Sequence, residues 1–148
     1  MDDRIADIYN LLQEMSWQFG DHGFNGECCG DLSLVEYMAL KKILNTKDIT
    51  IQEIGVALNF TKSGATRIID RLEQKRYVLR EQSSVDGRVC CVNLTSKGTK
   101  VMTEIIEKYT QYIQDLLQEF ESEKVESIRD SLGDLVEAVK KKPFNSSI

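Results

Sequence analysis

The sequence predicts a mainly α-helical fold that carries one small β-hairpin. Apolar residues along most of the chain recur at alternating spacings of three and four, which is the pattern of amphipathic helices. The 148 residues include one proline, Pro143, so little interrupts long helices. Two β-prone runs, 77–80 and 89–94, flank a turn-rich connection at 83–87, which indicates a hairpin. The predicted order is helix, helix, a short extended segment, helix, helix, hairpin, helix and helix.

The first two helices are expected at about residues 2–19 and 33–45. The first has a single apolar stripe spaced 3, 4, 3 and 4 residues apart: Ile5, Ile8, Leu12, Met15 and Phe19. The second has Leu34, Tyr37, Met38, Ile43 and Leu44. Residues 20–30, rich in Gly, Asn, Asp and Cys, are expected to form the loop between them.

Two short helices joined by a tight turn follow. Thr50 and Glu53 have the spacing of a capping box, in which each side chain satisfies a free backbone N–H group. Asn59 stands where a left-handed residue is expected, and Thr61 is a suitable N-cap for the next helix. The apolar face of that helix consists of Ala65, Ile68, Ile69 and Leu72. The opposite face carries Ser63, Thr66, Arg67 and Asp70.

The last two helices follow the hairpin, and Thr95 is expected to cap the first of them. Its inward residues are predicted to be Met102, Ile105, Tyr109, Ile113, Leu116 and Phe120. The final helix has a 3–4 stripe made of Val125, Ile128, Leu132, Leu135 and Val139. Because so short a chain cannot bury these stripes alone, they favour an intertwined homodimer over a monomer folded back on itself. Residues 33–95 would then form one lobe, and residues 1–20 and 96–142 a helical dimerisation layer.

The short helix pair with its hairpin has the organisation of a winged helix-turn-helix, and its charge fits a polyanionic partner. Residues 61–100 hold nine Lys or Arg and four acids, a net of +5, whereas the remainder of this chain, whose total is −5, has a net of −10. Concentrating positive charge on one element gives an acidic protein a local surface for double-stranded DNA. The alternative is that these basic residues lie on a helix face that contacts only solvent.

This organisation resembles the MarR family of bacterial transcription regulators over nearly the whole chain, and three stretches carry the resemblance. They are the helix-turn-helix ITIQEIGVALNFTKSGATRIIDRLEQKRYV, the wing Asp86-Gly87-Arg88 with Leu94-Thr95 at the family's interval, and Ser96-Lys97-Gly98. One position departs from the pattern: Arg76 stands where the family commonly has Gly after the recognition helix. The turn must therefore strain a non-glycine residue or use another geometry.

In a helix that enters the major groove, residues near its N-terminus reach base edges. Ser63, Thr66 and Arg67 are placed for that contact, and Arg is the side chain best suited to guanine. Thr61, Lys62 and Arg71 are expected to hold phosphates. The resemblance implies that Arg88 enters the minor groove and that Asp86 orients it by a salt bridge. A dimer would bind a pseudo-palindromic operator with half-sites about one helical turn apart.

Two vicinal cysteine pairs, Cys28-Cys29 and Cys90-Cys91, leave several interpretations open. Cys90 and Cys91 are most simply strand neighbours that point to opposite faces, one buried and one exposed. Cys28 and Cys29, near His22, Glu27 and Asp31, could sense oxidants or bind a soft metal, a metalloid or an iron–sulfur centre. The chain has no Cys-x-x-Cys spacing, so the metal signal is weak. Members of the resembled family respond to phenolic ligands, to oxidants through cysteine, or to metals.

The preferred interpretation is a non-enzymatic DNA-binding regulator, most simply a repressor, whose affinity for DNA changes with a small effector, a metal or thiol oxidation. The expected effector pocket lies between the helical dimerisation layer and the lobe formed by residues 33–95. Its candidate lining residues are Trp17, Phe24, Tyr37 and Met38, and the alternative is that these residues are ordinary core. The alternatives are a thiol-dependent redox protein using Cys28 and Cys29, and a winged-helix protein-interaction module. An N-terminus without a signal-peptide pattern, and no apolar run near the ~20 residues that span a bilayer, predict a cytoplasmic protein without membrane contact.

Overall fold

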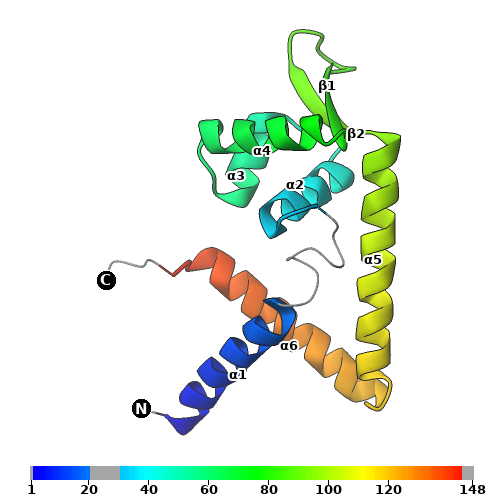
Figure 1. Cartoon of the computed structure of the whole chain (residues 1–148). Coiled ribbons are helices and arrows are strands. Elements are labelled where there is room, and N and C mark those ends of the chain that lie inside the picture. The colour runs from blue at the N-terminus through cyan, green and yellow to red at the C-terminus, as the bar shows by residue number, and fades with distance from the viewer. Residues whose placement is uncertain (1, 21–30, 145–148) are drawn as a thin grey trace. The chain divides into compact units, whose positions relative to one another are not determined.

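A computed structural model describes residues 2–20 and 31–144. The elements in order are α1 (Asp3–Gly20), α2 (Leu34–Asn45), α3 (Ile51–Leu58), α4 (Lys62–Gln74), β1 (Val78–Gln82), β2 (Cys90–Leu94), α5 (Ser96–Leu117) and α6 (Ser122–Lys141) (Figure 1). The predicted mainly α-helical fold with a hairpin wing is confirmed. The chain divides into two compact units, residues 1–108 and 109–148, with the boundary inside α5.

The core of the first unit lies among α2, α3, α4, the hairpin and the first turns of α5. All four predicted inward residues of α4 are buried: Ala65, Ile68, Ile69 and Leu72. Leu40 of α2, Ile54 of α3 and Met102 of α5 are fully buried against the same core. Each such aliphatic side chain contributes on the order of 1.5–3 kcal/mol of burial free energy, so the core fixes the positions of the surrounding helices.

The turn between α3 and α4 has the predicted chemistry. Asn59 adopts the left-handed conformation, with φ 60° and ψ 42°, and ends α3. Thr61 caps α4, because its hydroxyl oxygen accepts the N–H of Gly64 at 3.1 Å. Short polar side chains suit both positions, since Asn tolerates positive φ and Thr can replace the missing intrahelical acceptor.

The capping box predicted at Thr50 and Glu53 is wrong in one of its two bonds. The Thr50 hydroxyl accepts the N–H of Glu53 at 3.1 Å, but the Glu53 carboxylate binds that hydroxyl rather than the backbone N–H of Thr50. A complete capping box forms instead at the start of α2, where Ser33 and Glu36 satisfy each other's backbone N–H groups. The hydroxyl residue and the glutamate are three positions apart at both places. The two sites differ in the group that the glutamate carboxylate binds.

The hairpin is antiparallel, and its register pairs Val78 with Leu94 and Gln82 with Cys90. A single bridge joins Val92 to Ile49, which attaches the hairpin to the segment before α3. This bridge corresponds to the short extended segment predicted there. Because Val92 donates its N–H to the Ile49 carbonyl at 2.8 Å, the hairpin is anchored at its base to the helical core.

The turn after α4 strains a non-glycine residue. Arg76, at the position where the resembled family commonly has Gly, lies at φ 66°. The strained turn is held by tight contacts with the start of α5: the Thr95 hydroxyl donates to the Arg76 carbonyl at 2.6 Å and accepts the N–H of Gly98 at 3.0 Å. The predicted cap at Thr95 is confirmed. A Cβ on Gly98 would lie 2.1 Å from the Tyr77 carbonyl oxygen, so this approach requires glycine.

Apolar side chains on α1, α5 and α6 remain exposed in the single chain. Neither α1 nor α6 has a buried residue, and the buried residues of α5 are confined to its first half. Several residues predicted to point inward are about half exposed: Ile5, Ile8, Leu12, Met15, Leu116, Phe120, Leu132 and Leu135. Among the residues that the structure describes, these stripes are left without an apolar cover. Within the described residues, no helix is both long and apolar enough to cross a membrane.

Candidate nucleic-acid interface

The exposed face of α4 gathers the residues predicted to contact bases and phosphates. Thr61, Lys62, Ser63, Thr66 and Arg67 together line a shallow open depression at the start of α4. Ser63, Thr66 and Arg67 fall opposite the buried face because residues three or four apart share one side of a helix, whereas Thr61 and Lys62 are exposed at its first turn. The depression therefore lies at the end of α4 where a recognition helix meets base edges.

The hydroxyls on this face are already oriented by the helix itself. Thr66 donates to the Lys62 carbonyl at 2.9 Å, and the Thr61 and Ser63 hydroxyl oxygens lie 3.2 Å apart. The cations are different: Lys62, Arg67 and Arg71 are exposed, and no ion pair holds them within the described residues. They can therefore reach an anionic partner without breaking a contact inside the protein.

The two acidic residues in the second half of α4, Asp70 and Glu73, are paired inside the protein. Arg80 of β1 binds Asp70 and Glu73 at 2.5 Å each, and its backbone N–H donates to Glu73 at 3.3 Å. The hydrogen bond with Asp70, aided by Glu73, raises the pKa of Arg80 above its ordinary value. Arg80 thus attaches α4 to the hairpin and is not a free cation. Lys62, Arg67 and Arg71 of α4 and Arg88 of the wing remain exposed cations.

The wing tip is shaped by its own polar side chains. The Ser83 hydroxyl oxygen accepts the N–H groups of Val85 and Asp86 at 3.2 and 3.3 Å. Asp86 accepts the backbone N–H of Arg88 at 3.1 Å, and among the described residues its carboxylate forms no ion pair with the Arg88 guanidinium. The salt bridge expected between these two side chains is therefore absent from the described structure, and its formation on DNA stays a prediction. Asp86 instead orders the turn from which the exposed Arg88 extends.

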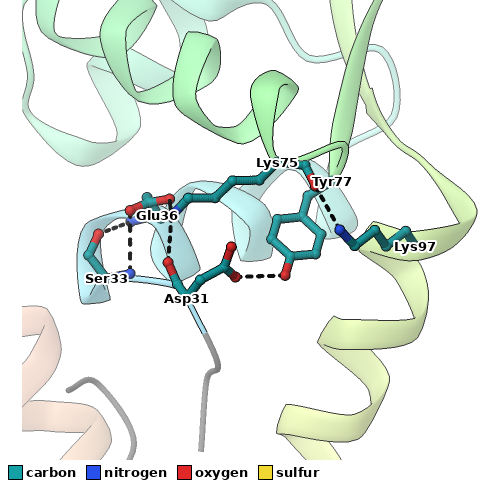
Figure 2. A network of polar contacts seen from close by, with 6 residues as sticks. All are labelled: Asp31, Ser33, Glu36, Lys75, Tyr77 and Lys97. Carbon is teal, nitrogen blue, oxygen red and sulfur yellow. Dashed lines mark hydrogen bonds and ion pairs between the residues drawn. The ribbon is translucent and has the colours of Figure 1, made fainter. Parts of the chain in front are cut away.

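Sequence reasoning missed a network that links α2, the end of α4 and the start of α5 (Figure 2). Lys75 binds Glu36 at 2.8 Å and also donates to the Asp31 carbonyl, while the Tyr77 hydroxyl donates to the Asp31 carboxylate at 2.7 Å. The Lys97 ammonium lies 4.8 Å from the centre of the Tyr77 ring. The one signal in the sequence was the Ser33-x-x-Glu36 spacing of a capping box.

Burial and charge shift two pKa values in this network. Burial, the hydrogen bond to Asp31 and the negative charges of Asp31 and Glu36 raise the pKa of Tyr77 to about 12. Burial alone would raise the pKa of Glu36, but the Lys75 ammonium and the Ser33 donors outweigh it and hold that pKa below its ordinary value. At neutral pH the tyrosine is therefore a hydrogen-bond donor and Glu36 a carboxylate.

The cysteine pair of the hairpin follows the simple strand interpretation. Cys90 is exposed and Cys91 is buried, as expected for neighbours on a strand. The Cys91 thiol donates weakly to the Glu81 carbonyl and to Asp48, at 3.4 and 3.6 Å. Burial and the neighbouring Asp48 carboxylate raise the pKa of this thiol, which makes it a poor nucleophile.

The other candidate sensing residues are only partly covered by the structure. Cys28 and Cys29, with His22, Phe24 and Glu27, lie outside the described residues. Elsewhere in the chain, over 2–20 and 31–144, no three His, Cys, Asp or Glu side chains form a group that could hold a metal ion. Trp17 borders a surface depression lined by α1 residues, whereas Tyr37 and Met38 lie on α2. The expected effector pocket therefore stays a prediction.

Comparisons with known proteins agree with this geometry. Residues 32–90 match the family model described as MarR family. The HTH-type transcriptional regulator MhqR of Bacillus subtilis (strain 168) is 27% identical over 132 residues, which cover 89% of this chain and 91% of MhqR. A solved MarR family protein from Bacillus stearothermophilus has a TM-score of 0.81 at 23% identity, covering 95% of this chain and 99% of that one.

A DNA complex also has this fold. Streptococcus pneumoniae FabT, solved in complex with DNA, has a TM-score of 0.76 at 20% identity, and the match covers 94% of this chain and 97% of that one. The matched family segment contains α2, α3, α4 and β1 and reaches the first residue of β2, so it includes the whole exposed face of α4 and the wing tip. Residues 32–90 thus match the MarR family, and the chain as a whole is similar in sequence and fold to winged helix-turn-helix transcriptional regulators of that family.

Proposed function

We propose that this DNA-binding transcriptional regulator binds a pseudo-palindromic operator as a homodimer and represses the genes beside it. The observation that carries the proposal is the exposed face of α4, where Lys62, Arg67 and Arg71 are free of internal ion pairs while Asp70 and Glu73 are neutralised by Arg80. A dimer seated on an operator that overlaps a promoter would exclude the polymerase. In a bacterium, such an operator-binding protein would act in the cytoplasm.

The roles of the DNA-binding residues follow from their chemistry. Arg67 would read guanine, because its planar fork matches the two acceptors on the major-groove edge. Ser63 and Thr66 would contact neighbouring bases, and Thr61, Lys62 and Arg71 the flanking phosphates. Arg88 would enter the minor groove, where a narrow groove concentrates negative potential. Asp86 supports that contact by ordering the backbone of the wing.

The dimer would be built from the helices with uncovered apolar stripes. We assign residues 33–95 to the DNA-binding lobe, and residues 1–20 and 96–142 to the dimerisation layer. The support is the exposure of α1 and α6, whose stripes have no buried residue in one chain. Two heads held by one layer would contact half-sites about one helical turn apart, so the spacing between the heads would set the affinity for the operator.

An effector would act by changing that spacing. It must bind one arrangement of the two heads more tightly than the other, because equal affinity for both shifts no equilibrium. We propose either a small molecule held between the layers or a change at Cys28 and Cys29 as that signal. The protein would act by binding rather than by catalysis, as transcriptional regulators do. The rival roles of thiol redox protein and protein-interaction module predict no salt-sensitive duplex binding.

The test is selection of bound duplexes from a random pool, followed by titration of the selected operator at salt concentrations from 50 to 200 mM. A dimer that neutralises several phosphates should lose affinity steeply, since each contact adds about 0.9 to the slope of log K against log salt. A selected palindrome with a steep slope supports the proposal. Weak binding without sequence enrichment would favour the rival roles.

A further inference from the structure

Lys75 lies where three elements meet (Figure 2). It is the C-cap residue of α4, and its side chain extends to the beginning of α2, where the ammonium binds Glu36 at 2.8 Å and donates to the Asp31 carbonyl. Its own carbonyl accepts a hydrogen bond from Lys97 of α5 at 3.0 Å. The end of the recognition helix is thus attached to both α2 and α5.

Tyr77, two residues later in the chain, also contacts both the segment before α2 and the start of α5. Its hydroxyl donates to the Asp31 carboxylate at 2.7 Å, and its ring lies under the Lys97 ammonium. The side chain is buried, with 7% of its surface exposed. Because Asp31 accepts from both Lys75 and Tyr77, the two residues act on the segment that leads into α2 as one unit.

Because the Glu36 carboxylate is buried, we expect the contact between the end of α4 and α2 to be either fully formed or fully broken. Glu36 is the buried charged residue among those that the structure describes, at 5% exposure. A buried carboxylate that loses its partner is left with an uncompensated charge, which is strongly unfavourable. Small displacements of α4 from α2 are therefore resisted, whereas a displacement large enough to admit water would release the helix end altogether.

We propose that Lys75 and Tyr77 are positioning residues for DNA recognition, and that Lys75 is not a phosphate ligand although it belongs to the basic segment. They hold the end of α4 against α2 and α5, and so set the direction in which the exposed face of α4 is presented. A rearrangement that reaches Asp31 along the chain, or Lys97 along α5, would open these contacts and reduce the fraction of protein competent to bind. This inference rests on the proposed DNA binding.

Three substitutions separate positioning from general stability. Glu36→Gln removes the charge that holds Lys75 but keeps an acceptor for the Ser33 N–H, so the α2 cap survives. Tyr77→Phe removes the bond to Asp31 and keeps the buried ring. Ser33→Ala is the matched control: it removes the cap bond to the Glu36 N–H and destabilises α2, but leaves the contacts with α4 in place.

The measurement is operator affinity against salt for the full-length protein, with circular dichroism and light scattering to verify folding and assembly. We expect Glu36→Gln and Tyr77→Phe to weaken binding about five- to tenfold with an unchanged salt slope, since the phosphate contacts of the bound state remain. Ser33→Ala should bind within about twofold of the wild type. Lys75→Met is a third substitution that breaks the network. It should have the same operator affinity and the same salt slope as Glu36→Gln.

Three results would overturn the positioning role. The first is wild-type affinity in folded Glu36→Gln and Tyr77→Phe. The second is an equal loss in Ser33→Ala, which would mean that destabilisation alone lowers affinity. The third is a salt slope lower by about one in Lys75→Met, which would make Lys75 a phosphate contact. Failure of the wild type to bind any duplex would instead overturn the proposed function itself.

Discussion

At the scale of single residues, Lys62 and Arg67 share the exposed face of α4 but differ in what they can recognise. Lysine is a point charge on a flexible stem, whereas the arginine fork matches the acceptors of guanine. Both side chains are exposed on a helix whose opposite face is fully buried, so either can be truncated without opening the core. A difference between the two variants would therefore report on DNA contacts.

We predict that Arg67→Ala relaxes the preference for the operator over its single-base variants, at a cost of about 1–3 kcal/mol on the correct sequence. Lys62→Ala should weaken all sequences about equally and lower the salt slope by about one. Competition titrations with a set of operator variants measure both effects. A uniform loss in Arg67→Ala would show that Arg67 holds a phosphate instead of a base.

The wing gives a second prediction at this scale. Arg88→Ala should weaken operator binding by about 1–3 kcal/mol and leave folding and assembly unchanged, because the side chain is exposed and its backbone N–H still binds Asp86. Val85→Ala is a suitable control, since Val85 is 93% exposed on the same turn and uncharged. Titration of labelled operator distinguishes them, and equal affinity for wild type and Arg88→Ala would remove the wing from the interface.

At the scale of elements, the junction between α4, β1 and α5 depends on backbone atoms that nearly touch. Gly98 admits no side chain, because the Tyr77 carbonyl oxygen stands 2.1 Å from where its Cβ would be. Arg76 in the same turn has positive φ, and Thr95 bonds the two segments together. The start of α5 is therefore fixed against the end of the recognition helix by shape as well as by polar contacts.

We predict that Gly98→Ala destabilises the protein by about 1–3 kcal/mol, the usual cost of overpacking a closely packed site. Gly87→Ala serves as the control, because open space surrounds that position in the same lobe. It should change stability by less than about 0.5 kcal/mol. Urea unfolding of both variants measures the difference. Equal midpoints would mean that α5 can withdraw from the turn without loss.

At the scale of the whole molecule, the uncovered stripes of α1, α5 and α6 predict assembly. Leu135 is 40% exposed in the single chain, so a carboxylate there is tolerable in a monomer but not in an apolar interface. We predict that Leu135→Asp gives a monomer or an unfolded chain. Val56→Asp, at an apolar position on α3 that is 77% exposed, should remain a dimer. Light scattering measures the mass, and a monomeric wild type would contradict the predicted layer.

Sensing also belongs to the whole molecule, since a signal at one segment must reach both DNA-binding heads. If Cys28 and Cys29 are the sensor, Cys28→Ser/Cys29→Ser should keep the basal operator affinity and lose its response to oxidant, zinc, copper(I) or arsenite. The shift needs only a few kcal/mol of differential binding. Cys90→Ser is the control for an exposed thiol. Identical responses in the double variant and the wild type would exclude these two cysteines and favour an organic effector.

The order of elements, the winged helix-turn-helix and the two faces of α4 could be predicted from the sequence. These features follow from local rules: apolar spacing places Ile68 and Leu72 inward, Asn59 tolerates positive φ, and Thr61 and Thr95 supply caps within four residues. The predicted DNA-facing residues of α4 come together for the same reason, since helix phase alone sets them opposite the buried face.

The pairing of the charged side chains could not be predicted from the sequence, because it depends on contacts that form when the chain folds. The sequence counts Arg80, Lys75 and Lys97 as part of one basic segment, but folding pairs Arg80 with Asp70 and Glu73, and brings Lys75 to Glu36, 39 residues earlier. Ion-pair partners such as Lys75 and Glu36 leave no periodic pattern in the sequence, because their separation in space depends on how α2, α4 and β1 pack.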